Sequence, residues 1–416
     1  MPHKYDFTRY KTTLQIIILL SIIIFLRAPR VFLEGRIWAE EGNVFFKTAY
    51  ESGVVSLFTL YAGYLNLFAN VCAYVASLLP LKCVGYVFVY ASLFVELGVV
   101  AYVLLQNNQY LNQWSRFLLV CMLIMSPNST SELFCNSINM QSWFGVWGLI
   151  LLFENGHLHS RRIQTISYIV YFMGCLTGVY CLFSVPFVVL RAIFCKIKHK
   201  SLPVYWKVLS VIGIVAGCIQ AASFLLSRKN MSSARGFEGF DALESLIYAF
   251  RFQFILPLLG KNVAAQIGNI GILIFVFSFL AIVILITWLC NKRCVRYVVC
   301  VMGVLFFVQI LIIAASLNHM AGGRYAFMPA FIVYMLFSIL LTELMEKRNF
   351  VISVALITYS IFLGTISLKE YINSKGFNYP NVLSWEKQVE AYEKNGEYDF
   401  QAWPDNWQTF TLKKKK

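Results

Sequence analysis

Long apolar runs recur along the chain and are separated by short polar segments. A helix needs about 20 apolar residues to cross the hydrocarbon core of a bilayer. Runs of that order cover residues 84–105, 163–190, 203–226, 266–289, 297–317, 325–343 and 350–367, with shorter runs at 14–28, 117–127 and 143–153. The run 163–190 has the length for two short spans broken around Gly178. The pattern predicts an all-α polytopic membrane protein with about eleven crossings.

Residues 62–80 have spanning length but carry many polar residues and stop at Pro80. We interpret them as an amphipathic helix in the outer headgroup region. With this segment left out of the crossings, the basic residues of the short loops gather on the side of the N-terminus, as the positive-inside rule requires. The N-terminus is then cytoplasmic, and most carboxylates lie outside.

This topology predicts two parts of the chain. Residues 1–367 form the transmembrane domain, and residues 368–416 form a small C-terminal cap on the outer side. The outer loops of the first part are residues 29–83, 127–142, 227–262 and 318–324.

Composition supports a membrane protein and excludes several other classes. Of the 416 residues, 59% are hydrophobic and only 13% are charged, whereas soluble domains carry about a quarter charged residues. Basic cytoplasmic loops account for the net charge of +15, so we expect a lipid bilayer as partner and no nucleic acid. The motifs of zinc, nucleotide and dinucleotide sites are absent from the sequence, so we expect no metal and no cofactor.

The first outer loop carries two adjacent carboxylates, Glu40 and Glu41, between Trp38 and Gly42. A carboxylate at the membrane edge, partly desolvated by aromatic neighbours, has a raised pKa and can take a proton from a sugar hydroxyl. The simpler interpretation of such a pair is a solvated acidic turn.

The segment Trp38-Ala39-Glu40-Glu41-Gly42, with residues 56–58 and 62–65, resembles the W-A-E-D-G loop of bacterial polytopic glycosyltransferases of the GT-C type. Chain length and predicted topology are similar to those of phage-encoded serotype-converting O-antigen glucosyltransferases. The resemblance implies a GT-C-like helical bundle, a polyprenyl-phosphate sugar as donor, an acid of the first outer loop as base, and inversion at the anomeric carbon. Glu41 stands where Asp is usual, so either acid can be the base; relatives favour the first, Glu40, with Glu41 as its orienting partner.

Sugar-binding candidates lie in the same loop and in a second, polar one. They are Trp38, Glu132, Asn136, Asn139 and Gln141. Irregular polar backbone at membrane depth is tolerated where it is buried in protein or lines a wet cavity, so in the second loop Asn136, Asn139 and Gln141 are candidates for hydrogen bonds to sugar hydroxyls. Glu132 is a candidate for a second acid. An ordinary surface loop is the alternative.

Phosphate-binding candidates are basic residues on the outer side, where the positive-inside rule disfavours them. A guanidinium can grip two phosphate oxygens in a fork, which suits Arg324 beside Tyr325 after two glycines. Arg36 and Arg235 are further candidates. A lone interfacial Arg is otherwise a snorkelling anchor.

The sequence and the resemblance together predict transfer of a hexose, with glucose as first expectation, from undecaprenyl phosphate to an O-antigen or lipopolysaccharide hydroxyl at the periplasmic face of the bacterial inner membrane. Trp385, Trp403 and Trp407 of the tail suit either acceptor binding or a packed lid. Glu96, an acid near a helix centre, supports the alternative of a lipid-linked oligosaccharide flippase or other transporter. An O-antigen polymerase is a third reading.

Overall fold

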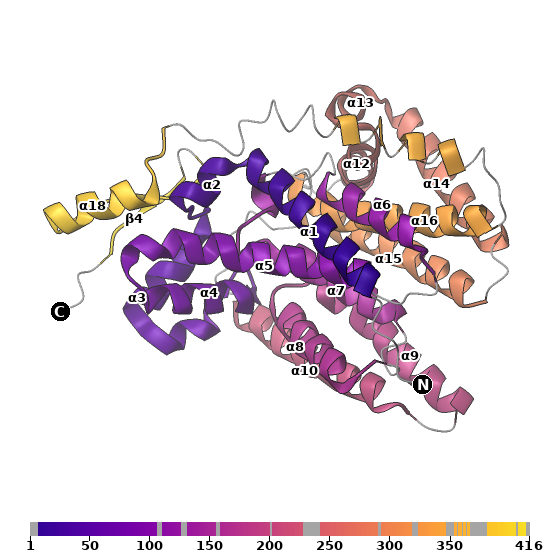
Figure 1. The fold of residues 1–416 in the computed structure, drawn as a ribbon, viewed down its shortest axis with the longest axis horizontal. Coiled ribbons are helices and arrows are strands. Elements are labelled where there is room, and N and C mark those ends of the chain that lie inside the picture. Colours follow the sequence, from indigo (N-terminus) through magenta and orange to yellow (C-terminus); the bar gives the residue numbers. More distant parts are fainter. Residues whose placement is uncertain are drawn as a thin grey trace. The chain divides into compact units, whose positions relative to one another are not determined.

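The computed structural model describes most of the chain, and it is predominantly helical (Figure 1). The described residues are 7–105, 110–125, 131–154, 159–199, 202–227, 242–289, 293–317, 323–346, 353–355, 357–359, 361–362, 364–366, 381–404 and 407–412. The chain divides into two compact units, and helices α1 (Phe7–Arg27) and α5 (Val84–Leu105) each begin in one and end in the other.

The first unit comprises residues 1–13, 100–130 and 232–373. Its elements are α6 (Gln113–Ile124), α11 (Ala242–Phe250), η9 (Arg251–Ile255), α12 (Leu256–Leu259), α13 (Lys261–Gln266), α14 (Asn269–Leu289), α15 (Arg293–Leu317), η11 (Gly323–Ala326) and α16 (Phe327–Glu346). An aromatic cluster joins three of them: the Phe279 ring lies 5.0 Å from Phe254 and 4.6 Å from Phe306, centroid to centroid. Such ring pairs add to the energy of apolar burial.

The second unit comprises residues 14–99, 131–231 and 374–416. Its first elements are α2 (Pro29–Glu34), η1 (Glu41–Phe46), α3 (Lys47–Ser52), η2 (Gly53–Phe58), β1 (Leu60–Tyr61), β2 (Tyr64–Leu65), α4 (Leu67–Ser77) and η3 (Leu81–Cys83). The remainder are η4 (Ser131–Leu133), α7 (Met140–Phe153), α8 (Arg161–Leu176), η6 (Cys181–Ser184), α9 (Val185–His199), α10 (Val204–Ser227), α18 (Trp385–Asn395), β3 (Phe400–Gln401) and β4 (Thr409–Phe410). Strands β1 and β2 pair antiparallel, as do β3 and β4.

Helix α7 forms the centre of the second unit, since nearly all its residues are buried. A helix that is apolar on every side requires packing partners all round. Gly148 of α7 allows η6 to approach closely, because a Cβ there would lie 2.7 Å from the Cys181 sulfur. Helices α8 and α10 run side by side (Figure 1).

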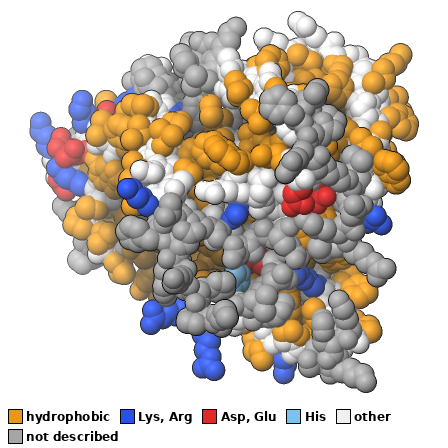
Figure 2. Space-filling model, turned by 45° about the vertical axis from the view of Figure 1, so that its right-hand side comes forward, with side chains coloured by type: hydrophobic (Ala, Val, Ile, Leu, Met, Phe, Trp, Pro, Cys, Tyr) orange, Lys and Arg blue, Asp and Glu red, His pale blue; other side chains and the backbone are white. Residues whose placement is uncertain are grey.

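Five described helical stretches are long and apolar enough to cross a membrane, which agrees with an all-α multi-pass membrane protein. They are Leu81–Leu105, Val204–Ser227, Ala242–Leu259, Val295–Ala315 and Arg324–Glu346. Large apolar side chains on α14 are exposed, as contact with lipid requires: Ile270, Phe277, Ile284 and Trp288. Figure 2 shows hydrophobic side chains spread over much of the described surface in its view.

The expectation of about eleven crossings is not confirmed, and one stretch differs from it. Residues 227–262 were expected to form an outer loop, whereas Ala242–Leu259 is a continuous helical stretch of spanning length. The expected break around Gly178 is confirmed: α8 ends at Leu176, Gly178 has a φ of +97°, and α9 begins at Val185. Within residues 62–80, α4 has 11 residues, about 16 Å of helix, too short to cross a core of about 30 Å.

Candidate active site

The acid loop, residues 36–42, leaves α2 directly over the start of α5. Gly35 ends α2 with a φ of +67°, a conformation that glycine adopts without cost. Gly35 and Gly85 face each other so closely that a Cβ on Gly85 would lie 2.9 Å from the Arg36 nitrogen. This backbone contact fixes where the loop begins relative to the membrane-spanning helix.

Arg36 is buried and holds the loop that precedes α7. Its Nη2 donates to the carbonyl oxygens of Phe134 at 2.7 Å and Cys135 at 2.9 Å. Its guanidinium lies 4.9 Å from the Trp38 ring centroid and 5.9 Å from that of Trp403. These contacts make Arg36 a structural clamp, and its binding of a donor phosphate stays a prediction.

Glu41 is completely buried, and both of its carboxylate oxygens accept hydrogen bonds. Oε2 accepts from the Trp38 backbone N–H at 2.7 Å, and Oε1 accepts from the Ser137 N–H at 2.5 Å and the Ser137 hydroxyl at 2.9 Å. Burial raises the pKa of Glu41 to about 7, although these hydrogen bonds and the charge of Arg36 act in the opposite direction. The Glu41 carboxylate therefore joins the acid loop to the loop before α7.

Glu40 lies in a different environment from its neighbour. It is half-buried, and its Oε1 accepts a hydrogen bond from the Tyr61 hydroxyl at 2.9 Å. The preceding residue, Ala39, has a φ of +44°, a left-handed conformation that is unusual for a residue with a Cβ. This turn directs two adjacent acids differently, Glu41 into the protein and Glu40 to its partly exposed side.

The amides of the second polar loop bond within that loop. The Asn136 and Asn139 side chains both donate to the Glu132 carbonyl oxygen, and Asn136 Oδ1 accepts from the Asn139 N–H at 3.0 Å. Both Asn residues are buried, while Glu132 is half-buried. Their described role is to shape the loop that carries Ser137, and sugar binding by them stays a prediction.

Gln141 lies at the start of α7 and joins two other parts of the unit. Its Nε2 donates to the Tyr64 hydroxyl at 3.4 Å, and its side chain packs against Gly178, where a Cβ would not fit. Gln141 is half-buried, so it remains a candidate for sugar contact beside the β1–β2 hairpin.

Glu96 of α5 supports the same loop from the membrane-spanning side. Its Oε1 accepts from the Cys135 N–H at 2.6 Å, and the nearby Arg27 guanidinium lies 4.3 Å from the Phe134 ring centroid. Glu96 is fully buried. The hydrogen bond and the adjacent positive charge explain how a carboxylate is tolerated inside the protein.

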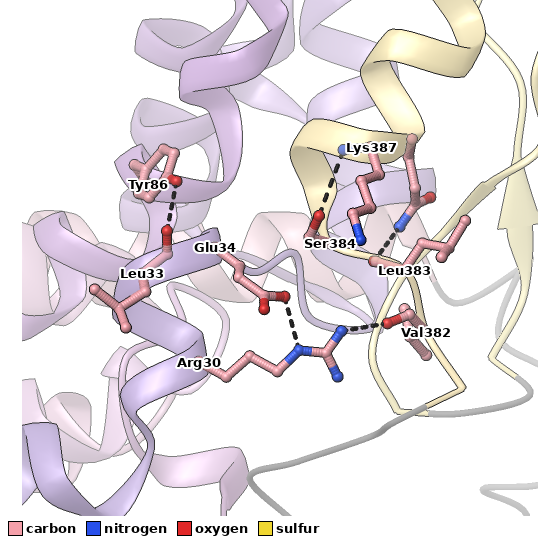
Figure 3. A network of polar contacts seen from close by, with 9 residues as sticks. Arg30, Leu33, Glu34, Tyr86, Val382, Leu383, Ser384 and Lys387 are labelled. Carbon is pink, nitrogen blue, oxygen red and sulfur yellow. Dashed lines mark hydrogen bonds and ion pairs between the residues drawn. The ribbon is translucent and has the colours of Figure 1, made fainter.

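The C-terminal tail docks on the acid loop. Arg30 of α2 donates to the Val382 carbonyl oxygen at 2.6 Å and pairs with Glu34 at 2.7 Å (Figure 3). Further along the tail, Trp385 Nε1 donates to the Leu81 carbonyl oxygen at 2.6 Å. Phe410 packs directly on Gly42, where a Cβ would overlap its ring. The tail is therefore part of the structure that fixes the two acids.

The three tail tryptophans are not equivalent. Trp385 and Trp403 are each 3% exposed, whereas Trp407 is 39% exposed. The first two belong to a packed lid, as one of the two sequence interpretations proposed. Trp407 alone of the three presents a ring surface of the size that sugar stacking uses.

Arg324 and Tyr325 lie in the first unit, at the start of the α16 stretch. Arg324 Nη2 donates to the Tyr325 hydroxyl at 3.2 Å, with the guanidinium 5.1 Å from the ring centroid. Both residues are half-buried. Residues 318–322, which precede Arg324 in the predicted loop, lie outside the described residues, as does Arg235. Within the described part of the chain, no group of His, Cys, Asp and Glu is arranged to hold a metal ion.

Two residues that contact the acids were not predicted from the sequence. Ser137 is 96 positions from Glu41. It lies in the second polar loop between the candidates Asn136 and Asn139, but its own residue type gave no signal. Tyr61 directly precedes the segment 62–65, which is part of the resemblance. Its position beside that segment was the one feature of the sequence that could have marked it as a site residue.

Together these features define a multi-pass helical membrane protein in which a buried acid loop is held by the loop before α7 and by the chain's own C-terminal tail. No protein-family model and no curated protein matches this chain.

Proposed function

We propose that the protein is a GT-C-type inverting glycosyltransferase of the bacterial inner membrane. It moves a hexose, glucose as first expectation, from undecaprenyl phosphate to an O-antigen or lipopolysaccharide hydroxyl on the periplasmic face. The observation that carries the proposal is the different environment of two adjacent acids: Glu41 is fully buried and bonded at both oxygens, whereas Glu40 is half-buried.

Glu40 is the general base in this scheme. A base must reach the proton that it removes, and the half-buried Glu40 has a partly exposed surface. Glu40 takes the proton of the acceptor hydroxyl while the acceptor oxygen attacks the anomeric carbon. The bond from that carbon to the phosphate oxygen breaks on the opposite face, so the sugar is inverted and the lipid phosphate leaves with the bonding electrons.

Glu41 is the orienting partner. A substrate hydroxyl cannot reach a carboxylate that has no exposed surface, and the two Glu41 oxygens already accept three hydrogen bonds from the protein. Its contribution is to hold the turn at Ala39, and thereby to set the direction of Glu40. This agrees with the preference for the first acid that the resemblance implies.

The remaining candidates act on the two substrates. Arg324 with Tyr325, and Arg235, bind the donor phosphate, and Arg324 neutralises the charge that develops as the phosphate leaves. Gln141 and Trp407 are the candidates with half-buried or exposed side chains for contact with sugar. The lipid carrier arrives activated, so the reaction requires no nucleotide cofactor.

The transporter alternative depends on Glu96, whose carboxylate has a structural partner in the Cys135 N–H. A polymerase would differ in its product. Comparing O-antigen linkages by composition and methylation analysis, in cells with and without this chain, separates the three. A branch sugar that is present only in cells with the chain supports the proposal. Polysaccharide that is shorter in cells without the chain supports a polymerase, and unchanged linkages contradict both enzymes.

Substitution of the acids then tests the assignment of roles. Glu40→Gln should lower sugar transfer by about 10²- to 10⁴-fold, the usual contribution of a general base, while the lipid-linked donor still binds. Glu41→Gln should reduce transfer less and also lower thermal stability, because an amide nitrogen would then face a backbone N–H. If Glu40→Gln transfers sugar normally and Glu41→Gln transfers none, then Glu41 is the base and Glu40 is its orienting partner.

A further inference from the structure

Tyr61 is the only described residue that bonds to the Glu40 carboxylate, with 2.9 Å between its hydroxyl and Glu40 Oε1. We propose that Tyr61 is a positioning residue that fixes the orientation of the Glu40 carboxylate for proton transfer. This inference rests on the proposed function, because it assigns a role through the proposed base. The support comes from how rigidly the fold holds the Tyr61 hydroxyl.

The first support is the hairpin that carries Tyr61. Strands β1 and β2 pair with Leu60 opposite Leu65 and Tyr61 opposite Tyr64. The two residues of the turn, Ala62 and Gly63, have φ values of +53° and +89°. Positive φ at both central positions characterises the tight turn whose twist matches that of paired strands. The Tyr61 backbone is thus set by a short, well-defined hairpin.

The second support is the attachment of this hairpin to a membrane-spanning helix. Gln220 of α10 is buried, and its Oε1 accepts from the Leu65 N–H while its Nε2 donates to the Leu65 carbonyl oxygen, both at 2.9 Å. A single side-chain amide therefore completes the hydrogen bonding of the strand as a neighbouring strand would. The Gly178 N–H also donates to the Leu65 carbonyl, at 3.3 Å.

The third support is the packing of the Tyr61 ring. It meets the ring of Phe45 edge to face, with centroids 6.0 Å apart and planes at 70°. Phe45 lies in η1, the element that begins at Glu41, and is 1% exposed. The ring is thus positioned by the same element that follows the acids.

The chemical consequence concerns the two oxygens of Glu40. A hydrogen bond donated to Oε1 restricts rotation of the carboxylate and leaves Oε2 as the oxygen that can accept the acceptor's proton. Catalytic groups must be held close to their productive geometry by neighbours that are themselves locked. Tyr61 meets that requirement without touching the sugar.

The test is Tyr61→Phe, which removes only the hydroxyl and keeps the ring packed on Phe45. We expect kcat for sugar transfer to fall about tenfold or more, as loss of a hydrogen bond to a charged group predicts, with KM for both substrates within about twofold of wild type. In a Glu40→Gln background, adding Tyr61→Phe should cause no further loss, because its target is gone.

Tyr86→Phe is the matched control, since the Tyr86 hydroxyl donates at 2.8 Å to the backbone carbonyl of Leu33 instead of an acid. It should keep kcat within about twofold, and both variants should melt within a few degrees of wild type. An unchanged kcat in Tyr61→Phe overturns the inference, as does a raised acceptor KM at constant kcat, which would place Tyr61 on the sugar. If Glu40→Gln itself transfers sugar normally, the proposed function fails instead.

Discussion

Trp38 and Trp403 pair through their backbones as an isolated parallel β-bridge. The Trp403 N–H donates to the Ile37 carbonyl at 2.9 Å, and its own carbonyl accepts from the Ala39 N–H at 2.5 Å. The tail thereby holds, by main-chain hydrogen bonds, the left-handed residue that precedes Glu40. A residue near the C-terminal end of the chain thus helps to fix the backbone of the acid loop.

Trp403→Ala should lower both stability and sugar transfer. The indole is buried between the acid loop and the tail, and truncating a buried Trp typically costs about 3–5 kcal/mol. Trp407→Ala is the control for stability alone, because Trp407 is 39% exposed and its truncation should leave the melting temperature nearly unchanged. The measurements are thermal unfolding in detergent and transfer assays. Equal melting temperatures for the two variants would argue against a docked tail.

Gly42→Ala should detach the tail locally from the acid loop. A Cβ at position 42 would overlap the Phe410 ring, and overpacking of this kind costs about 1–3 kcal/mol. Gly42→Ala should therefore lower sugar transfer. Adding Phe410→Ala should recover part of this loss, since removing the Phe410 ring makes room for the Cβ at position 42. Gly217→Ala serves as control, because nothing lies within 4 Å of its added Cβ. Additive losses in the double variant would show that the two positions do not interact.

Stability should depend on pH through Glu41. Burial raises the pKa of Glu41 from 4.5 to about 7, so between these values the folded chain holds a proton that the unfolded chain releases. The free energy of unfolding therefore falls as pH rises from 4.5 through 7, by roughly 3 kcal/mol in total.

The measurement for Glu41 is the melting temperature of wild type and Glu41→Gln between pH 5 and pH 8. Wild type should lose stability relative to the variant as pH rises, because Gln does not titrate. Glu51→Gln, at an exposed position, should follow wild type throughout. A constant difference between wild type and Glu41→Gln over this range would contradict the assignment.

Arg324 and Arg36 should respond differently to replacement by lysine. Arg324→Lys removes the planar fork that grips phosphate and should raise the donor KM about tenfold with little change in melting temperature. Arg36→Lys should lower the melting temperature, because one ammonium cannot reproduce the guanidinium's bonds and stacking. Its donor KM should stay near wild type. A raised donor KM in Arg36→Lys would instead support the sequence-based prediction that Arg36 binds the donor phosphate.

The class of the protein was predictable because hydropathy is a local property. Runs such as 84–105 and 203–226 coincide with described helices of spanning length. The turn at Gly178 separates α8 from α9, as the sequence indicated. The stretch Ala242–Leu259 was not predicted, since Arg251 and Gln253 interrupt its apolar pattern. In the structure Gln253 is fully buried, and Arg251 Nη2 donates to the Ile267 carbonyl oxygen at 3.1 Å.

The candidate site was predictable only in part. The motif identified Glu40 and Glu41 together, yet their different burial follows from partners that are distant in sequence, Ser137 for one and Tyr61 for the other. Arg36 illustrates the same point: its basic character indicated an anion, whereas its described partners are backbone carbonyls and aromatic rings.

The sequence by itself determined the membrane class, most of the long helices and the position of the acid pair, because side-chain polarity and run length act on each segment separately. Only the tertiary structure decided which acid is enclosed and which is accessible, and that the tail holds their loop through Trp403. The reason is that desolvation and hydrogen bonding depend on contacts between segments that are distant in the sequence. The residues of one segment do not reveal which other segments it will contact.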